Sequence, residues 1–471
     1  MQAIRPALFF FLIFLLLNCG ASYQQRMLSA EKSFFEGSPA QAVASIKYNA
    51  AEAGDEDKLV YYLEAGITLH TAGDYEQSNN VFQAAQNLID EYRTSVSDEV
   101  SAFILNERGS EYHGEIFEHV LVGYYRALNF VLLNQKDAAR KTLQKLELDM
   151  RTLKYDDAAY KQVLAARYLS ALLAEDDKDW NTARVQYKNF ELFKFDSSWL
   201  NRQKYILAKK ENDLETIREL ELTIKDNRQF DNIKEKGQLV IIHQAGKAPV
   251  KKSRGKLAQD QKFWLAMRVA IDAAILSEGS MLSSAAAVAA LGTAENPIPE
   301  YVFRDPAAAK TASLTLNDQQ YNLQVLTDYE SMATHNFNDQ YDAMVAKSTA
   351  SLAVKFVSAA VASYALGKSA DEAVGGGLGG AILKILIGGG AGAAVAQTLK
   401  PDLRCWRTLP ANIQMQRIIL EPGTYTLTMR LSPGVREINE IPAEITIEAG
   451  KTVYVNLRSF TPGVEAIPVG L

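Results

Sequence analysis

Glu115 and His119 are the two side chains whose types and spacing come closest to a metal-binding arrangement. Residues four apart share one face of a helix, and a carboxylate and an imidazole are both common metal ligands. The pair does not form the zinc motif His-x-x-Glu-His, because position 115 is Glu and not His. We therefore predict no metal site here. We interpret the two residues as a polar helix face that is either solvated or lines a binding groove.

Cys19 stands where a thiol can be acylated. It follows Arg5 and an apolar run from Ala7 to Leu17 that is too short to span a membrane, which is the layout of a secretory signal. A cysteine at that processing site resembles a lipobox, whose thiol receives diacylglycerol and becomes the first residue of the mature chain. The alternatives are an ordinary signal peptide with a chance cysteine, or an uncleaved anchor. Resemblance to Gram-negative sorting rules implies the outer membrane, because Gly20 replaces the aspartate that favours inner-membrane retention.

Residues Ala362–Ser369 fit a relaxed phosphate-binding pattern that ends in Gly367, Lys368 and Ser369. A P-loop requires a strand, then a glycine-rich loop, then a helix. Here an alanine-rich helical pattern comes first and the loop glycines are absent. We therefore predict a helix that ends at Gly367, and no bound nucleotide.

The composition argues against other classes of function. A net charge of -6 over 471 residues implies no strongly basic surface, so we expect no nucleic-acid partner. The sequence has no Gly-x-Ser-x-Gly, no His-Glu-x-x-His and no cysteine with a neighbouring histidine motif. We predict a non-enzymatic protein without a cofactor. If Cys19 is lipidated, Cys405 is the remaining cysteine, and we expect it to be buried and inert.

A recurring spacing of small and large residues predicts helical pairs in the first half of the chain. In each set a small residue is followed by a second small residue twelve positions later and a large apolar residue four positions after that. The four sets are Ala30, Ala42 and Ile46; Gly66, Ser78 and Phe82; Ala127, Ala139 and Leu143; and Ala171, Ala183 and Tyr187. Small residues let two antiparallel helices touch closely, and the large residue packs on the next pair. This spacing resembles the tetratricopeptide repeat, whose concave surface holds a peptide or a partner's helix. A degenerate fifth unit is expected near 205–220.

Alternating apolar residues predict strands in the second half. The predicted strands are Gly237–His243, a hairpin over Ser313–Leu326, Ile413–Leu420, Thr424–Leu431, Glu444–Glu448 and Val453–Leu457. We expect them to form a small antiparallel sandwich. The basic run Lys251–Arg254 is expected to be a solvated loop.

Two apolar stretches interrupt the strands. The first is alanine-rich and lies within 256–293, and the second spans 346–400 and contains the glycine-rich segment 375–396. Glycines in such a segment permit close helix contact, whereas Lys355 and Lys384 interrupt the apolar runs. A buried helical hairpin is our interpretation, and membrane insertion or oligomeric packing is the alternative.

The segment Asp402–Pro410, with Gly423 and Tyr425 after the next strand, is similar to a family of tetratricopeptide-repeat-containing envelope lipoproteins of Gram-negative bacteria. Tyr112, Gly114, Glu115, Val120–Leu128 and Gly237–Ile242 contribute to the same resemblance. The family has no established catalytic residues, so the resemblance implies a location and an architecture but no reaction. Arg and Trp are common interface anchors. The candidate partner-binding residues are Tyr112, Glu115, His119, Tyr124, Arg404, Trp406 and Arg407. Alternatively, Trp406 fills the core of the β domain while the two arginines pair with acidic neighbours.

These features together predict an α+β multidomain protein with an N-terminal tetratricopeptide-like α-solenoid and a C-terminal β-sandwich-like domain with apolar helical insertions. The predicted parts are a lipoprotein signal peptide (1–18), a tether (19–28), the helical repeat domain (29–235), a first β part (236–345) with its insertion (256–293), an apolar helical hairpin (346–400) and a C-terminal β region (401–471). We expect an outer-membrane scaffold that faces the periplasm and binds an envelope protein on its concave surface. The alternative is a membrane-inserting or pore-associated component that uses 375–396.

Overall fold

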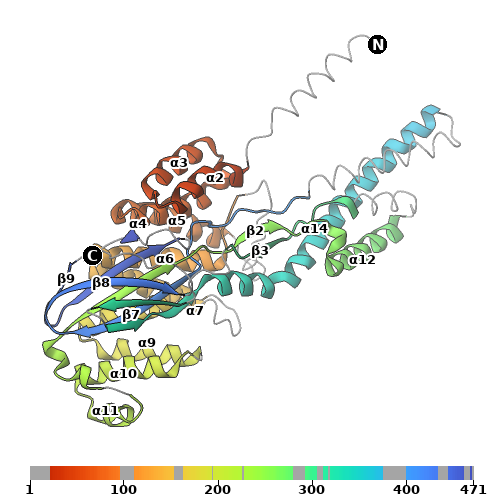
Figure 1. Ribbon diagram of the computed structural model, residues 1–471. Coiled ribbons are helices and arrows are strands. Elements are labelled where there is room, and N and C mark those ends of the chain that lie inside the picture. The colour runs from red at the N-terminus through yellow and green to blue at the C-terminus, as the bar shows by residue number, and fades with distance from the viewer. Residues whose placement is uncertain are drawn as a thin grey trace.

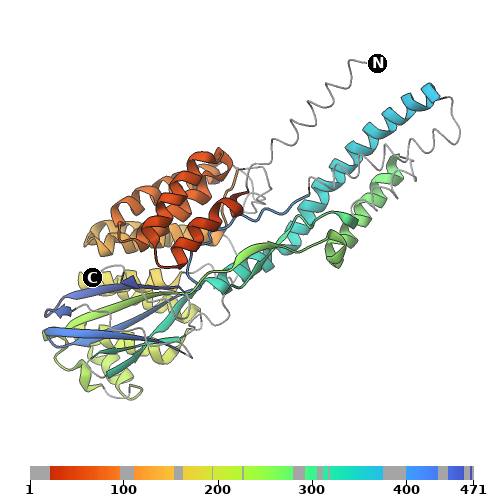
Figure 2. The ribbon, with the colours of Figure 1, turned by 45° about the horizontal axis from the view of Figure 1, so that its top comes forward.

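The computed structural model describes residues 22–95, 111–152, 163–193, 195–224, 227–278, 292–304, 311–316, 319–374, 399–432, 444–460 and 467–468. Cys19 and the segment 375–396 lie outside these residues. The fold is mixed α and β, and its sheets are mainly antiparallel. In Figures 1 and 2 a body of helices and strands carries a long arm that stands out to one side.

The first half of the chain is a series of helices in which each packs against the next. The helices are α2 (Tyr23–Phe35), α3 (Pro39–Glu52), α4 (Lys58–Thr71), α5 (Tyr75–Ser95), α6 (Ile116–Leu132), α7 (Lys136–Thr152), α8 (Leu164–Asp176), α9 (Trp180–Leu192), α10 (Ser197–Glu211) and α11 (Leu214–Glu221). α2 begins earlier than the predicted start at residue 29. Ser22 caps the helix, and Tyr23 and Met27 are buried in the core.

The predicted close contacts within the helical pairs are confirmed. The residues of all four spaced sets are buried. At Gly66 the contact is tightest, because a β-carbon built there would lie 2.4 Å from Cε1 of Phe82. The hydroxyl of Ser78 donates to the carbonyl of Gly66 at 2.7 Å. α10 and α11 also pack on each other, which confirms a fifth helical pair in the region predicted.

The turn inside each pair has the same backbone design. A residue with positive φ precedes the second helix, and the following N–H donates to a carbonyl five residues back, as in a Schellman motif. The left-handed residues are Gly37, Gly73, Asn134, Lys178 and Asn212. Glycine and asparagine adopt this conformation at little cost. Lysine rarely adopts it, but Lys178 has φ of 62°. The chain therefore accepts backbone strain at Lys178 that the other four turns avoid.

The predicted strands are confirmed and form two larger sheets. One has the order β11-β10-β1-β7-β6, and the other β5-β4-β8-β9. Their bounds are β1 (Gly237–Ala245), β4 (Thr311–Leu316), β5 (Gln319–Asn322), β6 (Gln324–Asp328), β7 (Asn412–Leu420), β8 (Gly423–Ser432), β9 (Glu444–Ile447), β10 (Thr452–Ser459) and β11 (Ile467–Pro468). β1 is antiparallel to β7 but parallel to β10. The expectation of purely antiparallel pairing was wrong for β1 and β10. These two strands are far apart in the sequence, and the arm lies between them along the chain.

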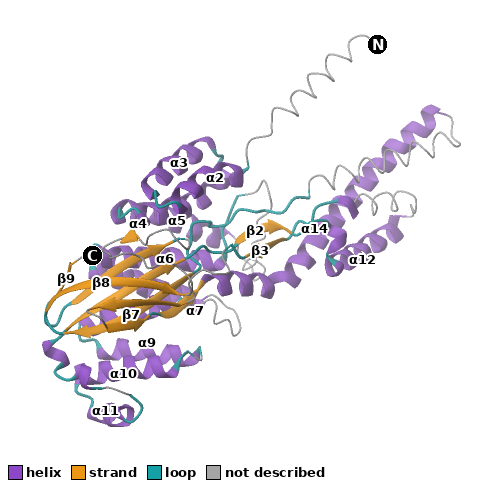
Figure 3. Cartoon of the chain, viewed as in Figure 1, coloured by secondary structure: helices purple, strands orange, loops and turns teal. Residues whose placement is uncertain are grey.

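β1 is buried on both faces and lies between two layers. Leu239 and Ile241 belong to a core shared with β4, β8 and β9, whereas Val240 and Ile242 belong to the core shared with the helices. Figure 3 shows the strands lying against the helices of the body. The five-stranded sheet is therefore the middle layer: one face packs on the four-stranded sheet and the other on the helical array.

The arm consists of α12 (Gln261–Glu278) and α14 (Tyr329–Val374), which pack side by side. A short pair of strands, β2 (Val250–Ser253) and β3 (Pro299–Val302), joins α12 to the body. Two predictions were wrong here. α14 starts well before residue 346, because Phe337, Met344 and Val345 are buried in a core shared with α12, and it continues past Gly367. Lys251 is in a strand and 3% exposed, and not in a solvated loop.

Candidate functional site

The helical array has one face that is covered by the rest of the chain. The first helix of each pair contributes a contact to it. Phe34 of α2 packs on Phe460 at a ring distance of 5.0 Å, and Tyr125 of α6 donates to Gln244 of β1 at 3.1 Å. On α10, the side-chain oxygen of Gln203 accepts from Nε of Arg417 at 3.1 Å. The first helices of the pairs therefore face the chain's own sheet.

Segment 402–409 lies along the same face and is held by two buried carboxylates. Glu118 of α6 accepts the backbone N–H of Trp406 at 2.7 Å. Glu64 of α4 accepts the backbone N–H of Arg407 at 2.6 Å and that of Thr408 at 3.2 Å. Carboxylates that accept backbone N–H groups form charge-assisted hydrogen bonds. The segment is bound in the manner of an extended peptide, but it belongs to the same chain.

Trp406, Arg404 and Arg407 make internal contacts. Trp406 is 1% exposed and packs against the rings of Phe82 and Tyr125, so it fills part of the core between helices and sheet. Arg404 pairs with Asp402 at 2.7 Å and with Asp57 at 3.0 Å. Arg407 pairs with Glu31 at 2.7 Å. The arginines pair with acidic neighbours, as in the alternative interpretation, whereas Trp406 lies in the core between helices and sheet and not inside the β domain.

The carboxylate of Glu115 lies at the base of the arm. Glu115 caps the N-terminus of α6. Its carboxylate pairs with Lys251 of β2 and accepts from Asn336 of α14 at 3.4 Å. Burial alone would lower the pKa of Lys251, but Glu115 and Asp402 raise it above its usual value. This buried ion pair connects the arm to the helical array.

Tyr112, His119 and Tyr124 are also buried. The hydroxyl of Tyr112 donates to Glu118 at 2.7 Å. Nε2 of His119 is 2.7 Å from the carbonyl of His113, and burial lowers the pKa of His119 to about 3. His119 and Glu115 therefore do not converge on a common ligand. Among the described residues no group of three His, Cys, Asp or Glu side chains is arranged to hold a metal.

Glu64 and Glu118, which hold the covered segment, were not among the residues predicted for a site. Burial and the neighbouring Glu115 raise the pKa of Glu118 to about 7, and burial raises the pKa of Glu64. One signal was present in the sequence: each is a lone carboxylate in a helix that is otherwise almost entirely buried. A buried carboxylate requires donors, so these positions marked where another segment had to bind.

Cys405 is buried within the same segment, as predicted. Burial raises the pKa of its thiol to about 11. The thiolate is therefore disfavoured at neutral pH, and the thiol is a poor nucleophile.

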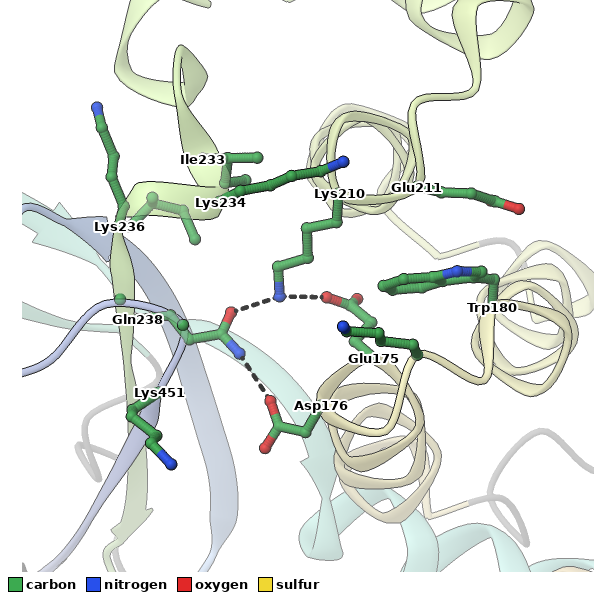
Figure 4. A pocket seen from close by; sticks show the side chains of 14 residues that line it. Glu175, Asp176, Trp180, Lys210, Glu211, Ile233, Lys234, Lys236, Gln238 and Lys451 are labelled. Carbon is green, nitrogen blue, oxygen red and sulfur yellow. Dashed lines mark hydrogen bonds and ion pairs between the residues drawn. The ribbon is translucent and has the colours of Figure 1, made fainter.

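A solvent-facing cavity lies elsewhere, where the helices meet the sheet. It has a volume of about 540 Å³ and is bordered by the ends of α8 and α10, the start of β1 and the start of β10. Figure 4 shows Lys210 pointing into it and Trp180 forming one side. We call it the lysine pocket, after five of its lining residues: Lys178, Lys210, Lys234, Lys236 and Lys451.

Comparisons with known proteins assign no family to the chain: no family model, curated protein or solved structure matches it. The functional proposals therefore rest on the sequence and the geometry.

Proposed function

We propose that this chain is a non-enzymatic, lipid-anchored scaffold of the bacterial envelope that presents the α12–α14 arm to a partner protein. In this proposal the helices form a tetratricopeptide-like solenoid, the strands form a sandwich-like unit, and Cys19 carries the lipid. The resemblance to envelope lipoproteins supports the location. We choose the arm because one face of the helical array is already covered. A partner on that face would have to displace the chain's own segment 402–409.

The arm has exposed apolar side chains suited to a partner. Leu265 and Val269 of α12 are 64% and 63% exposed, and Val354 of α14 is 67% exposed. Residues four apart share a helix face, so Leu265 and Val269 form a short apolar stripe. Large apolar residues clustered on one exposed face are typical of interaction surfaces.

Site-specific photocrosslinking in cells tests the proposal. A photoreactive amino acid at Leu265 or Val354 is expected to give a discrete crosslinked product. The same amino acid at Leu222, which is 93% exposed on the body, is the matched control and should give none. A product from Leu222 alone, or no product from the arm, would contradict the choice of the arm. Labelling with an alkyne palmitate analogue, with Cys19→Ala as control, tests the anchor separately.

A second candidate function is membrane contact by the arm. α14 is described as far as Val374, at the far end of the arm, and the apolar segment 375–396 follows it in the sequence. The middle of the arm, 264–269 and 343–355, contains Arg268, Lys347 and Lys355 but no acidic residue, whereas Asp272, Glu278, Asp371 and Glu372 follow further along the two helices. None of the described helices combines the length and apolarity needed to span a bilayer. Flotation with anionic vesicles, lost in a variant with all three cations replaced by Gln, would favour this alternative.

A further inference from the structure

We propose that the lysine pocket binds a sugar phosphate, with the phosphate held by lysine ammonium groups and the sugar ring against Trp180. The proposal is independent of the scaffold function. The pocket is open to solvent and is built from four separate parts of the chain, the α8–α9 turn, α10, the start of β1 and the start of β10.

The pocket lining has an excess of positive charge. It contains five lysines and three carboxylates, those of Glu175, Asp176 and Glu211. Each carboxylate already has a cation from outside the lining. The pairs are Glu175 with Arg417 at 2.6 Å, Asp176 with Lys136 at 2.7 Å, and Glu211 with Arg184. Lys210 also pairs with Glu175 and Lys236 pairs with Glu421 at 3.0 Å, so the positive charge available to an anion is that of Lys178, Lys234 and Lys451.

Three of the lysines have no polar partner among the described residues. Lys178, Lys234 and Lys451 are exposed and make no side-chain hydrogen bond or ion pair with any described residue. Lys210 donates to Glu175 at 2.8 Å and to Gln238 at 3.0 Å, which fixes it in the middle of the pocket. In Figure 4 Lys234 extends across one side, whereas Lys451 extends outward on a flexible stem that can turn to a bound anion.

The backbone at Lys178 points independently to a ligand. The four equivalent turns place Gly or Asn in the left-handed conformation, whereas this turn places a lysine there. A left-handed lysine is strained, and retained strain of this kind is typical of binding sites. The strained residue belongs to the turn that borders the pocket. We infer that its ammonium group, and not its backbone, is what the position requires.

The size and shape of the pocket favour an organic phosphate over a bare ion. A volume of about 540 Å³ is in the range of small-molecule sites. Trp180 is half-buried, begins α9 and presents its ring to one side of the pocket. A sugar has an apolar face that can pack on an indole ring, while its phosphate reaches the lysines. A phosphate attached to a sugar-like ring could be presented by a soluble sugar phosphate or by the headgroup of a glycosylated or inositol lipid.

Isothermal titration of the full chain in low-salt buffer tests this inference. α-Glucose 1-phosphate is expected to bind at one site, glucose not to bind, and inorganic phosphate to bind more weakly. The variants Lys178→Asn, Lys234→Gln and Lys451→Gln should each weaken binding by about twofold to fivefold, as expected for exposed charge interactions. Trp180→Leu should remove the advantage of glucose 1-phosphate over phosphate. Asn at position 178 keeps the left-handed turn, so its effect reports the lost ammonium group.

Lys47→Gln is the matched control, because Lys47 is an exposed lysine of α3, which does not line the pocket. Displacement of glucose 1-phosphate by phosphatidylinositol vesicles but not by phosphatidylcholine vesicles would identify a lipid headgroup as the source, and no displacement by either would identify a soluble ligand. The inference is overturned if glucose 1-phosphate does not saturate a site. It is also overturned if Lys47→Gln weakens binding as much as the pocket variants do, or if Trp180→Leu leaves the preference for the sugar unchanged.

Discussion

Arg417 of β7 donates to Glu175 of α8 across 2.6 Å, and neither side chain is exposed to solvent. Burial alone would raise the pKa of Glu175, but Arg417 and Lys210 hold it below its usual value. Tyr187 donates to the same carboxylate at 2.5 Å. The ion pair therefore joins the sheet to the helical array at a point where either charge alone would be costly.

Replacing Arg417 with Met should strongly destabilise the protein. Removing one partner of a buried ion pair costs up to about 3–5 kcal/mol when the other charge is left unpaired, and Lys210, which still pairs with Glu175, should reduce this loss. The double variant Arg417→Met/Glu175→Met should recover much of this loss, as measured by urea unfolding. Lys136→Met is the control for a partly exposed pair, and we expect a loss below about 1 kcal/mol. Additive losses in the double variant would show that the two residues do not act as a pair.

Gly66→Ala should destabilise the contact between α4 and α5. The added methyl group would lie 2.4 Å from the ring of Phe82, and overpacking of this kind costs about 1–3 kcal/mol. Phe82→Leu removes the obstructing ring and leaves a cavity, so it is destabilising by itself. The double variant should be more stable than the sum of the two losses predicts. Strict additivity in thermal or urea unfolding would refute steric conflict as the cause.

His70 predicts a dependence of stability on pH. Its Nδ1 lies 2.5 Å from Asn129, and its Nε2 faces the side-chain amides of Gln244 and Asn456 at 2.8 and 2.9 Å. Burial lowers the pKa of His70 from 6.5 to about 4. The unfolded state therefore binds more protons between these values, and stability falls as the pH drops below 6.5.

Between pH 6.5 and pH 4, His70 should lower the free energy of unfolding by about 1.4 kcal/mol for each unit by which the pH falls. His70→Gln should remove that contribution, so the difference in unfolding free energy between wild type and variant should shrink as the pH falls. His335→Gln, at an exposed position on α14, is the control and should follow the wild-type curve. A difference that is constant from pH 7 to pH 4.5 would contradict the prediction.

The helical pairs could be predicted because their determinants are local. The spacing that joins Gly66, Ser78 and Phe82 depends on two helices and one turn, and the structure has that contact. Strand prediction succeeded for the same reason, since alternation and turn residues lie within each hairpin. The start of α14 was missed because residues 329–345 are largely polar, although Phe337, Met344 and Val345 are buried in the core shared with α12.

The covered face could not be predicted from spacing. Glu64 binds backbone groups at Arg407 and Thr408, which lie more than three hundred positions away along the chain. Lys251 was expected in solvent because a basic run is usually exposed, but its partner Glu115 comes from the helical half. Contacts of such sequence separation leave only an indirect signal, such as a carboxylate inside an apolar helix.

Trp406→Ala should release segment 402–409 from the helical array. Loss of a buried Trp costs about 3–5 kcal/mol, and the backbone N–H of residue 406 would no longer be held in place by a ring that packs against Phe82 and Tyr125. We expect faster proteolytic cleavage within 399–411 at native temperature. Trp264→Ala in the arm, where the ring is only partly buried, should leave that cleavage rate unchanged. Equal acceleration in both variants would indicate general destabilisation.

Lys178→Gly should make the protein more stable, although it removes a charged side chain. Lys178 has φ of 62° at a turn position where Gly37 and Gly73 have φ of 83°. An L-residue pays about 1–2 kcal/mol for this conformation and glycine does not, while the greater freedom of glycine in the unfolded chain offsets part of the gain. A rise of about 0.5–1 kcal/mol in urea unfolding is expected. The reverse exchange, Asn134→Lys in the equivalent turn of the previous pair, is the matched control and should lower stability by a similar amount. If Lys178→Gly is destabilising, the ammonium group already makes stabilising contacts within the chain, and the strain at this turn has a structural cause.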